Sequence, residues 1–267
     1  MSNPFDANRD TAAEPRYGEA QPIPEQPQMV QMRLPVYPDI AWKVLLGLII
    51  MVYAVEVVLS GSFNPTTDVL FLMGAKWNPS IYNDREYWRL FTPMFLHGGV
   101  LHLLFNGYSL FAVGPTVERF LGTARFLGLY FIAGLAGSVA SYTFSPSLSV
   151  GASGAIFGLV GGLAVFFYVS RKTFGEMARQ QLGSLLTVIM LNLFIGFGGG
   201  NIDNYAHIGG LLGGALLGWL LSPRLVVDDR LYPPQVVRSF LPFGWPGALA
   251  FLAALAALVL FVIVPPM

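Results

Sequence analysis

The segment Val150–Gly158 reads Val-Gly-Ala-Ser-Gly-Ala-Ile-Phe-Gly and places one serine between two glycines at the start of a long apolar run. The run has close to the ~20 residues that a helix needs to cross the hydrocarbon core of a bilayer. The hydroxyl of Ser153 would therefore lie at the mouth of a membrane helix, with no bulky neighbour in sequence to shield it. Gly154, Gly158 and Gly162 recur every four residues along this run, and such small-residue stripes let helix backbones approach closely.

The composition is that of an integral membrane protein. Of the 267 residues, 54% are hydrophobic and only 11% are charged, against roughly 25% charged in soluble domains. The mean hydropathy is +0.59. The net charge is zero, which argues against nucleic acid as a partner. The chain has no cysteine, which excludes disulfides, thiolate metal sites and a cysteine nucleophile.

Seven apolar segments follow the polar N-terminal region, and we expect each to form a transmembrane helix because lipid offers the backbone no hydrogen-bond partner. The predicted fold is therefore an all-α polytopic membrane protein. The predicted spans are 42–60, 95–115, 123–143, 153–170, 182–199, 204–222 and 245–264.

Three other stretches have a different character. Residues 1–40 are polar and proline-rich, which predicts a disordered cytoplasmic tail. The tract 61–94 contains Trp77 and Trp88, and because aromatic residues favour the membrane interface we expect a membrane-associated loop. Residues 223–244 are interpreted as a cytoplasmic linker that leads to the last span.

The distribution of positive charge predicts the orientation. If the N-terminus lies inside, alternating spans put twelve of the fifteen Lys and Arg residues on one side and only Lys76, Arg85 and Arg89 on the other. Positive charge marks the cytoplasmic face. We therefore expect a cytoplasmic N-terminus, in the plasma or inner membrane of a prokaryote.

With this topology, three of the predicted helices start at the outer face and carry polar residues near their starts. His102 and Asn106 are four residues apart, which puts imidazole and carboxamide on one helix face. Ser153 opens a second helix, and His207 lies in the first turns of a third. Polar residues inside a membrane are costly and are candidates for function.

A second glycine stripe predicts which helices touch. Gly210, Gly214 and Gly218 follow His207 at i+3, i+7 and i+11, on the face of the histidine itself. If this stripe faces the one that follows Ser153, the serine and the histidine meet near the outer end of the bundle.

Each of these residues also has an ordinary structural interpretation. A serine in a membrane helix usually bonds its own i−4 carbonyl, a histidine at a helix start can pack or cap, and Asn106 could tie two helices together. Glycine stripes are common in membrane bundles. The coincidence of a serine, histidines and an asparagine at one depth is what favours a site.

Other chemistries fit the sequence less well. His97 and His102 are five apart and lack the Glu of a helical zinc protease motif, so we expect no metal site. The glycines at 196–200 lack the strand-then-helix setting of a dinucleotide loop, so we expect no cofactor. Asp203, four residues before His207, could orient the imidazole as in a catalytic triad, but it should lie nearer the outside water.

These motifs resemble those of the rhomboid family of intramembrane serine proteases, over roughly residues 85–220. Each motif alone is weakly specific, but all five occur in the family's order and on the expected segments. The GxSG nucleophile motif is Gly151–Gly154, and the His–Asn pair on the oxyanion side is His102–Asn106. The histidine helix with its glycine stripe contains Ala206–Gly214. The Trp-Arg pair of the first loop is Trp88–Arg89, and the turn after the second helix is Glu118–Arg119.

The resemblance implies a Ser–His dyad without an acid. Ser153 would attack the scissile carbonyl, and His207 would take its proton and later protonate the leaving amine. The oxyanion would be held by the backbone N–H of Ser153 and by the side chains of His102 and Asn106. Phe157 stands where some relatives carry tyrosine and would stack beside His207. The supporting residues would be Gly151, Gly154, Phe157, Gly210 and Gly214.

The resemblance also implies a fold and a substrate class. A rhomboid-like six-helix core would cover 41–222, and an extra C-terminal transmembrane helix would lie within 245–267, as in the six-plus-one type. Partners would be the lipid bilayer and proteins with transmembrane helices that unwind easily near their outer end. The glycine-rich segment 198–201 would move as a lid. The resemblance specifies neither a physiological substrate nor an oligomeric state.

Two alternatives to a serine-type endopeptidase stay open at this point. A catalytically silent rhomboid-like protein would bind or chaperone membrane helices, and loss of Ser153 or His207 would favour it, yet both are present. A transporter would need charged residues at the bilayer midplane or an inverted repeat. Glu56 and Glu118 fall near predicted helix ends and form no chain through the bilayer.

Overall fold

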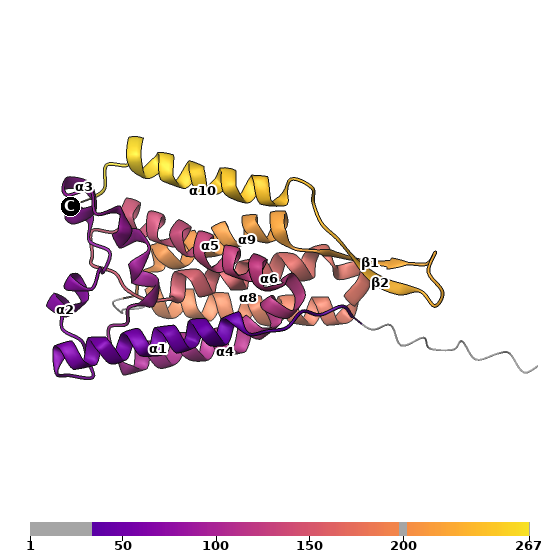
Figure 1. Ribbon diagram of the computed structural model, residues 1–267, viewed down its shortest axis with the longest axis horizontal. Coiled ribbons are helices and arrows are strands. Elements are labelled where there is room, and N and C mark those ends of the chain that lie inside the picture. The colour runs from indigo at the N-terminus through magenta and orange to yellow at the C-terminus, as the bar shows by residue number, and fades with distance from the viewer. Residues whose placement is uncertain (1–33, 198–201, 267) are drawn as a thin grey trace, which may run out of the picture. The chain divides into compact units, whose positions relative to one another are not determined.

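The computed structural model describes residues 34–197 and 202–266, and within them it confirms the predicted all-α fold (Figure 1). Residues 1–33 of the predicted tail and the predicted lid at 198–201 lie outside the described residues. The described elements are α1 (Ala41–Ser60), α2 (Thr67–Leu72), α3 (Asn78–Asn83), η1 (Tyr87–Leu90), η2 (Thr92–Phe95), α4 (Val100–Leu121), α5 (Thr123–Phe144), α6 (Ser153–Val169), α7 (Arg171–Phe174), α8 (Glu176–Phe197), α9 (Asn204–Leu221), β1 (Arg224–Asp228), β2 (Gln235–Ser239) and α10 (Gly244–Phe261).

Five of the described helices are long and apolar enough to cross a membrane, namely α1, α4, α5, α8 and α10. The other two predicted spans form α6, with 17 residues, and α9, with 18 residues and a polar start. Figure 1 shows α6 between α5 and α9 on one side and α8 on the other, and α6 packs mainly against α9 and α5. Because other helices cover α6, it needs no continuous surface toward lipid.

The two glycine stripes meet backbone to backbone where α6 and α9 pack. A Cβ built on Gly210 would lie 2.0 Å from the carbonyl oxygen of Gly154, and one built on Gly214 would lie 2.1 Å from that of Gly158. No side chain fits at such distances, so only glycine permits this approach. Close packing of this kind is a main source of stability between membrane helices, since lipid removes most of the hydrophobic driving force.

Helix α4 begins five residues later and ends six residues later than the sequence predicts. Gly98 and Gly99 disfavour a helical start at residue 95, and Pro115 is accommodated inside the helix rather than ending it. The added last turn carries Glu118, which is fully buried. Its carboxylate accepts hydrogen bonds of 3.0 Å from the backbone N–H groups that start α1, so it satisfies donors that a helix N-terminus otherwise leaves unpaired.

The predicted flanking segments have more structure than their composition suggests. The Tyr37 N–H donates to the Arg119 carbonyl over 2.8 Å, which fixes the end of the predicted tail against the last turn of α4. The predicted linker contains an antiparallel hairpin, with β1 and β2 paired from Arg224–Ser239 to Asp228–Gln235. Helix α8 begins at Glu176, six residues before the predicted start, so the polar residues that precede the apolar run are also helical.

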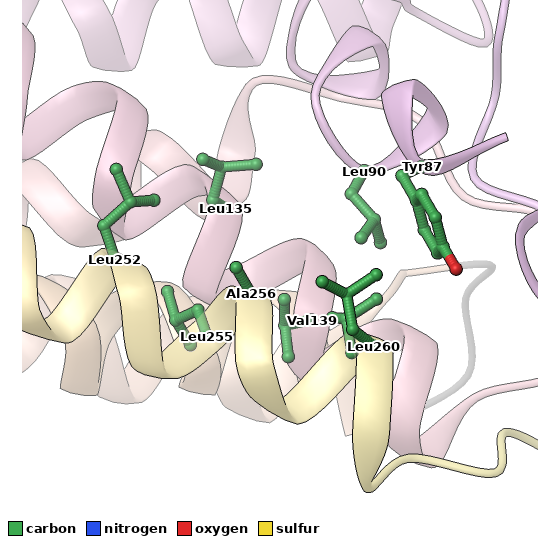
Figure 2. A pocket seen from close by; sticks show the side chains of 9 residues that line it. Tyr87, Leu90, Leu135, Val139, Leu252, Leu255, Ala256 and Leu260 are labelled. Atoms are coloured by element: carbon green, nitrogen blue, oxygen red, sulfur yellow. The ribbon is translucent and has the colours of Figure 1, made fainter. Parts of the chain in front are cut away.

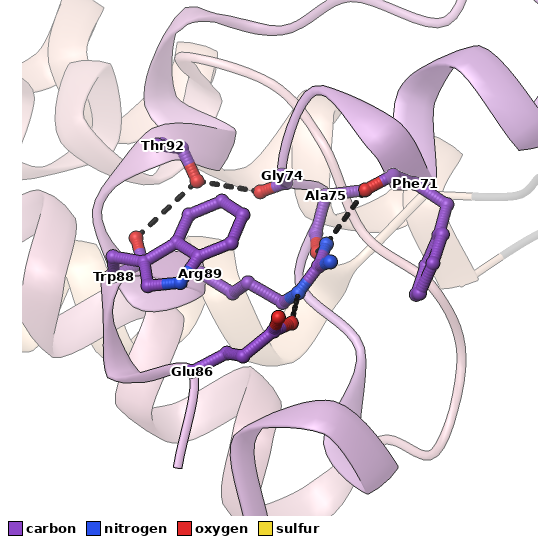
Figure 3. A network of polar contacts seen from close by, with 7 residues as sticks. All are labelled: Phe71, Gly74, Ala75, Glu86, Trp88, Arg89 and Thr92. Atoms are coloured by element: carbon purple, nitrogen blue, oxygen red, sulfur yellow. Dashed lines mark hydrogen bonds and ion pairs between the residues drawn. The ribbon is translucent and has the colours of Figure 1, made fainter. Parts of the chain in front are cut away.

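A buried arginine holds the first loop together (Figure 3). Arg89 is 4% exposed, and its Nη1 donates to the carbonyl oxygens of Phe71 (2.7 Å) and Ala75 (3.2 Å). Its Nε donates to the Glu86 carboxylate. Buried charges are tolerated only when they are paired and hydrogen-bonded, and both conditions are met here. The arginine thereby satisfies carbonyl groups at and beyond the end of α2. Contact of this loop with the membrane interface stays a prediction.

The glycine contact gives a direct test of the packing. Gly214→Ala should destabilise the protein by about 1–3 kcal/mol, because the new methyl group overlaps the Gly158 carbonyl. Gly183→Ala on α8 is the matched control, since a Cβ there meets nothing within 4 Å. It should be neutral or stabilise by up to ~1 kcal/mol through helix propensity. Thermal unfolding in detergent measures both variants, and equal effects would contradict the observed packing.

Candidate active site

Ser153 begins α6 at the end of a loop that is held from two sides. The Lys76 N–H donates to the Ser149 carbonyl over 2.9 Å and the Ser149 N–H donates back over 3.1 Å. Gly151 has a φ of +130°, a conformation that favours glycine, and its N–H donates to the Pro93 carbonyl over 2.8 Å. The serine hydroxyl is therefore placed at a fixed point where the chain turns into the helix.

His207 meets this hydroxyl from the second turn of α9. Its Nε2 lies 2.8 Å from the Ser153 Oγ, although 54 residues separate the two in sequence. The Phe157 ring, one turn further along α6, stacks on the imidazole with centroids 4.3 Å apart and planes 11° apart. His207 is only 7% exposed. The structure thus brings the predicted nucleophile and the predicted base into hydrogen-bond contact, with the ring orientation set by stacking.

Asp203 does not complete a triad. One of its carboxylate oxygens accepts from the Ala206 N–H over 3.0 Å and caps α9, and the other accepts from the Ser141 hydroxyl on α5. Among the described residues, the His207 Nδ1 has no hydrogen-bond partner, so neither carboxylate oxygen is bonded to the imidazole. Asp203 positions the helix that carries the histidine rather than the imidazole itself.

His102 lies beside the serine from α4. Its Nδ1 accepts from the Gly98 N–H over 3.4 Å, which assigns the ring proton to Nε2. A Cβ built on Gly151 would lie 2.7 Å from this Nε2 and 3.6 Å from the Ser153 Oγ. The imidazole edge therefore covers the bare face of Gly151, and its N–H donor is turned toward the serine loop. This contact gives Gly151 a second reason to be glycine.

Asn106 lies one turn beyond His102 on α4 and is 5% exposed. Its Nδ2 donates to the His102 carbonyl over 3.0 Å. A carboxamide carries two N–H groups, so a second donor remains after this bond. In the described part of the chain, the structure joins Ser153, His207 and Phe157 directly and leaves Asn106 bonded within its own helix.

The sequence profile of the family described as Rhomboid domain matches residues 84–224, which is more than half of the chain and includes His102, Asn106, Ser153, Phe157 and His207. The chain belongs to the rhomboid family. Together with the apolar helices, this makes it an integral, multi-pass membrane protein with the rhomboid fold. The family resemblance inferred from the motifs is confirmed.

Several curated rhomboid relatives are similar to the chain. Rhomboid protease GluP of Bacillus subtilis (strain 168) is 46% identical over 166 residues, which cover 62% of this chain and 31% of GluP. Rhomboid-like protease 3 of Toxoplasma gondii is 35% identical over 188 residues, covering 68% of this chain and 71% of that protein. The putative rhomboid protease YdcA of Bacillus subtilis (strain 168) is 42% identical over 137 residues, 51% of this chain and 67% of YdcA. The chain thus spans about a third of GluP's length.

Two residues beside the rhomboid motifs support His102 and were not predicted. Glu56, fully buried near the end of α1, accepts from the His97 N–H with both carboxylate oxygens at 3.2 Å. The His97 ring packs edge-on against that of His102, with centroids 5.1 Å apart. Burial lowers the pKa of His97 to about 3, so its ring stays neutral beside its neighbour. An isolated glutamate in an apolar run was the only sequence signal for this support.

A buried lysine anchors the serine loop and was also not predicted. Lys76 is 1% exposed, and its Nζ donates to the carbonyl oxygens of Ser145 (2.8 Å) and Ser141 (3.4 Å) at the end of α5. The Asn78 Nδ2 donates to the same Ser145 carbonyl over 3.0 Å. The Ser145 carbonyl follows the last residue of α5, so these bonds satisfy a group that the helix C-terminus leaves unpaired, close to the Ser149 bridge. Among the described residues, no group of three His, Asp or Glu side chains is placed to hold a metal ion.

The lysine predicts a pH dependence of stability. Burial lowers the pKa of Lys76 from 10.5 to about 8. Between these values the unfolded chain binds more protons than the folded one, so the free energy of unfolding should rise as the pH increases from about 8 to 10.5. The rise should be about 3 kcal/mol.

The test compares unfolding in detergent across this pH range for the parent chain, Lys76→Met and Lys172→Met. Lys172 is exposed on α7, so its variant should keep the rise, whereas Lys76→Met should lose it. An unchanged slope in Lys76→Met would assign the effect to other groups.

Proposed function

We propose that this rhomboid protein is an intramembrane serine endopeptidase that hydrolyses peptide bonds in or near transmembrane helices of other proteins. The observation that carries the proposal is the 2.8 Å contact between the Ser153 Oγ and the His207 Nε2. The relatives named as rhomboid proteases support the same reaction class. The chain requires no cofactor in this proposal.

The first half of the reaction transfers the acyl group to the serine. The Ser153 Oγ attacks the carbonyl carbon of the scissile bond, and the His207 Nε2 takes the hydroxyl proton. The resulting tetrahedral intermediate collapses, the C–N bond breaks, and His207 gives the same proton to the leaving amine. The product is an acyl-enzyme ester on Ser153 and a free amino terminus.

Negative charge on the carbonyl oxygen has to be stabilised while the intermediate exists. The His102 Nε2–H is turned toward the serine loop, and the Ser153 backbone N–H lies at the first turn of α6, where no intrahelical acceptor exists. The second N–H of Asn106 is the third donor in this proposal. A donor of this kind typically contributes ~3 kcal/mol to transition-state stabilisation.

The second half of the reaction needs water at the ester. The oxygen of a water molecule attacks the ester carbon while His207 takes one of the water protons. The tetrahedral intermediate then collapses, the bond between the acyl carbon and the Ser153 Oγ breaks, and His207 gives the proton to the Ser153 Oγ. The 17 residues of α6 rise about 25 Å, less than the ~30 Å hydrocarbon core. In this proposal, the helix start lies below the outer surface and is reached through the polar groups that surround it.

The substrate in this proposal is a transmembrane helix that unwinds near its outer end. Carbonyl groups within a helix are engaged in hydrogen bonds and are not free for attack. Segments with Gly, Ala or Pro nearby and a small residue before the cut should therefore be preferred. The charge distribution supports a cytoplasmic N-terminus and a site open to the outer face.

The dyad is tested with the purified full chain and a single-pass membrane-protein substrate. Ser153→Ala and His207→Ala should each lower the turnover number by about 10⁴-fold or more, the scale measured for comparable groups in other serine proteases. A serine-directed phosphonate should label Ser153 in the parent chain. Both variants should still bind the substrate, because neither change touches the glycine contacts that hold α6 against α9.

Equal cleavage rates for the parent chain, Ser153→Ala and His207→Ala would exclude the dyad. Phosphonate labelling of a residue other than Ser153 would also exclude it. Substrate binding without cleavage by the parent chain would instead favour the alternative of a rhomboid-like helix-binding protein.

The oxyanion donors are tested with a matched pair of asparagines. Asn106 and Asn192 each donate to a carbonyl four residues earlier, but Asn192 lies exposed on α8. His102→Ala and Asn106→Ala should lower the turnover number by about 10²-fold or more, with little change in KM. Asn192→Ala should leave it unchanged. If Asn106→Ala behaves like Asn192→Ala, Asn106 does not contact the oxyanion.

A further inference from the structure

An apolar groove runs between α5 and α10, on a side of the molecule that the proposed reaction does not use (Figure 2). Its volume is about 230 Å³. Figure 2 shows Leu252, Leu255, Ala256 and Leu260 along one side of α10, facing Leu135 and Val139 of α5, with Leu90 and Tyr87 at one end.

The groove lies beside the contacts that hold α10 against the bundle: Leu255 and Val259 pack in a buried cluster with Val139 of α5. A Cβ built on Gly244 would lie 2.4 Å from the Leu220 carbonyl oxygen, so the first turn of α10 touches the α9 backbone. Further along, Ala256 and Leu260 line the groove and are exposed. Both α5 and α10 are apolar enough to span a membrane, so the groove opens toward lipid rather than water.

A second, polar hollow adjoins the groove and shares Leu260 with it. Its volume is about 390 Å³, and its wall includes Tyr82, Asn83, Arg85 and the residues that follow α10. The Arg85 Nη1 donates to the Tyr87 hydroxyl over 2.9 Å, and Tyr87 itself lines the apolar groove. A cation therefore stands where the apolar groove meets the polar hollow.

Arg85 is unlike the other cations on the predicted outer side. Lys76 and Arg89 are buried and bound to backbone carbonyls, whereas Arg85 is exposed. Glu86, the next residue, is already paired with Arg89. Within the described part of the chain, no carboxylate forms an ion pair with Arg85, so its guanidinium is left to bind an anion.

We propose that this is a phospholipid-binding site, with one acyl chain in the groove and the phosphate bound by Arg85. The groove is smaller than the ~300 Å³ at which pockets for whole ligands begin, so it takes a chain segment only. A helix, ~10 Å or more across, does not fit. An extended peptide would leave its backbone groups unpaired against apolar walls, whereas an acyl chain has none. This site is independent of the proposed proteolysis.

The test uses the full chain, delipidated in detergent and titrated with dioleoyl phosphatidylglycerol. Native mass spectrometry measures the lipid-bound fraction, and thermal unfolding measures the stabilisation that binding confers. The parent chain should bind one phosphatidylglycerol molecule more tightly than any further ones. The lipid-bound chain should unfold at a higher temperature than the lipid-free chain. Dioleoylglycerol, which lacks the phosphate, and inorganic phosphate, which lacks the chains, should both bind more weakly.

Two pairs of variants separate the groove from the cation. Arg85→Gln should weaken lipid binding about tenfold or more, as expected for loss of a charged hydrogen-bond partner, whereas Arg179→Gln on α8 should not. Ala256→Phe fills the groove and should also weaken binding. Ala257→Phe, the same change at the adjacent exposed position outside the groove, should bind like the parent chain.

Equal lipid binding by all four variants would overturn the proposal. It would also be overturned if Ala256→Phe left lipid binding intact but converted a dimer to a monomer, because the groove would then hold a second copy of the chain. The unchanged unfolding temperature of a lipid-free Ala256→Phe chain would exclude misfolding as the cause of lost binding.

Discussion

The backbone contact between α6 and α9 is the constraint on which the arrangement of the candidate active site depends. Gly210 touches Gly154 so closely that neither helix can slide or rotate without a clash. Ser153 directly precedes one of these glycines and His207 lies three residues before the other. A rotation of either helix by one residue, about 100°, would turn its polar side chain away from the partner. The contact therefore fixes the register that brings hydroxyl and imidazole together.

Polar groups in the bundle are used mainly to satisfy helix ends and loop backbone. A membrane helix has unpaired N–H groups at its start and unpaired carbonyls at its end, and lipid cannot bind them. Glu118 binds the N–H groups at the start of α1, Lys76 and Asn78 bind carbonyls at the end of α5, and Arg89 binds carbonyls at the end of α2. Few charged residues are needed because each one serves several backbone groups.

The difference between side-chain and backbone partners explains what the sequence could predict. The serine, the histidines and the glycine stripes follow helical spacing. Their partners are side chains or glycines, which can be identified directly in the amino-acid sequence. The roles of Glu56, Lys76 and Glu118 were not predictable, because they bind backbone groups, which every residue possesses and which leave no pattern. The extent of α4 was missed for a related reason. A proline usually marks a helix end. The helical turn that follows Pro115 is explained only by the hydrogen bonds that Glu118 makes with the start of α1.

The same packing bears on how a Ser–His pair could work without an acid. In a triad the carboxylate holds the imidazole in one orientation. Here Asp203 instead ties the start of α9 to α5, and the ring of His207 is held by stacking on Phe157. A Cβ built on Gly137 of α5 would lie 2.6 Å from the Ala206 carbonyl oxygen, so α9 is closely packed against α5 as well as α6. Orientation is thus supplied by a rigid helix and an aromatic ring, which preorganise the proposed base at no further entropic cost.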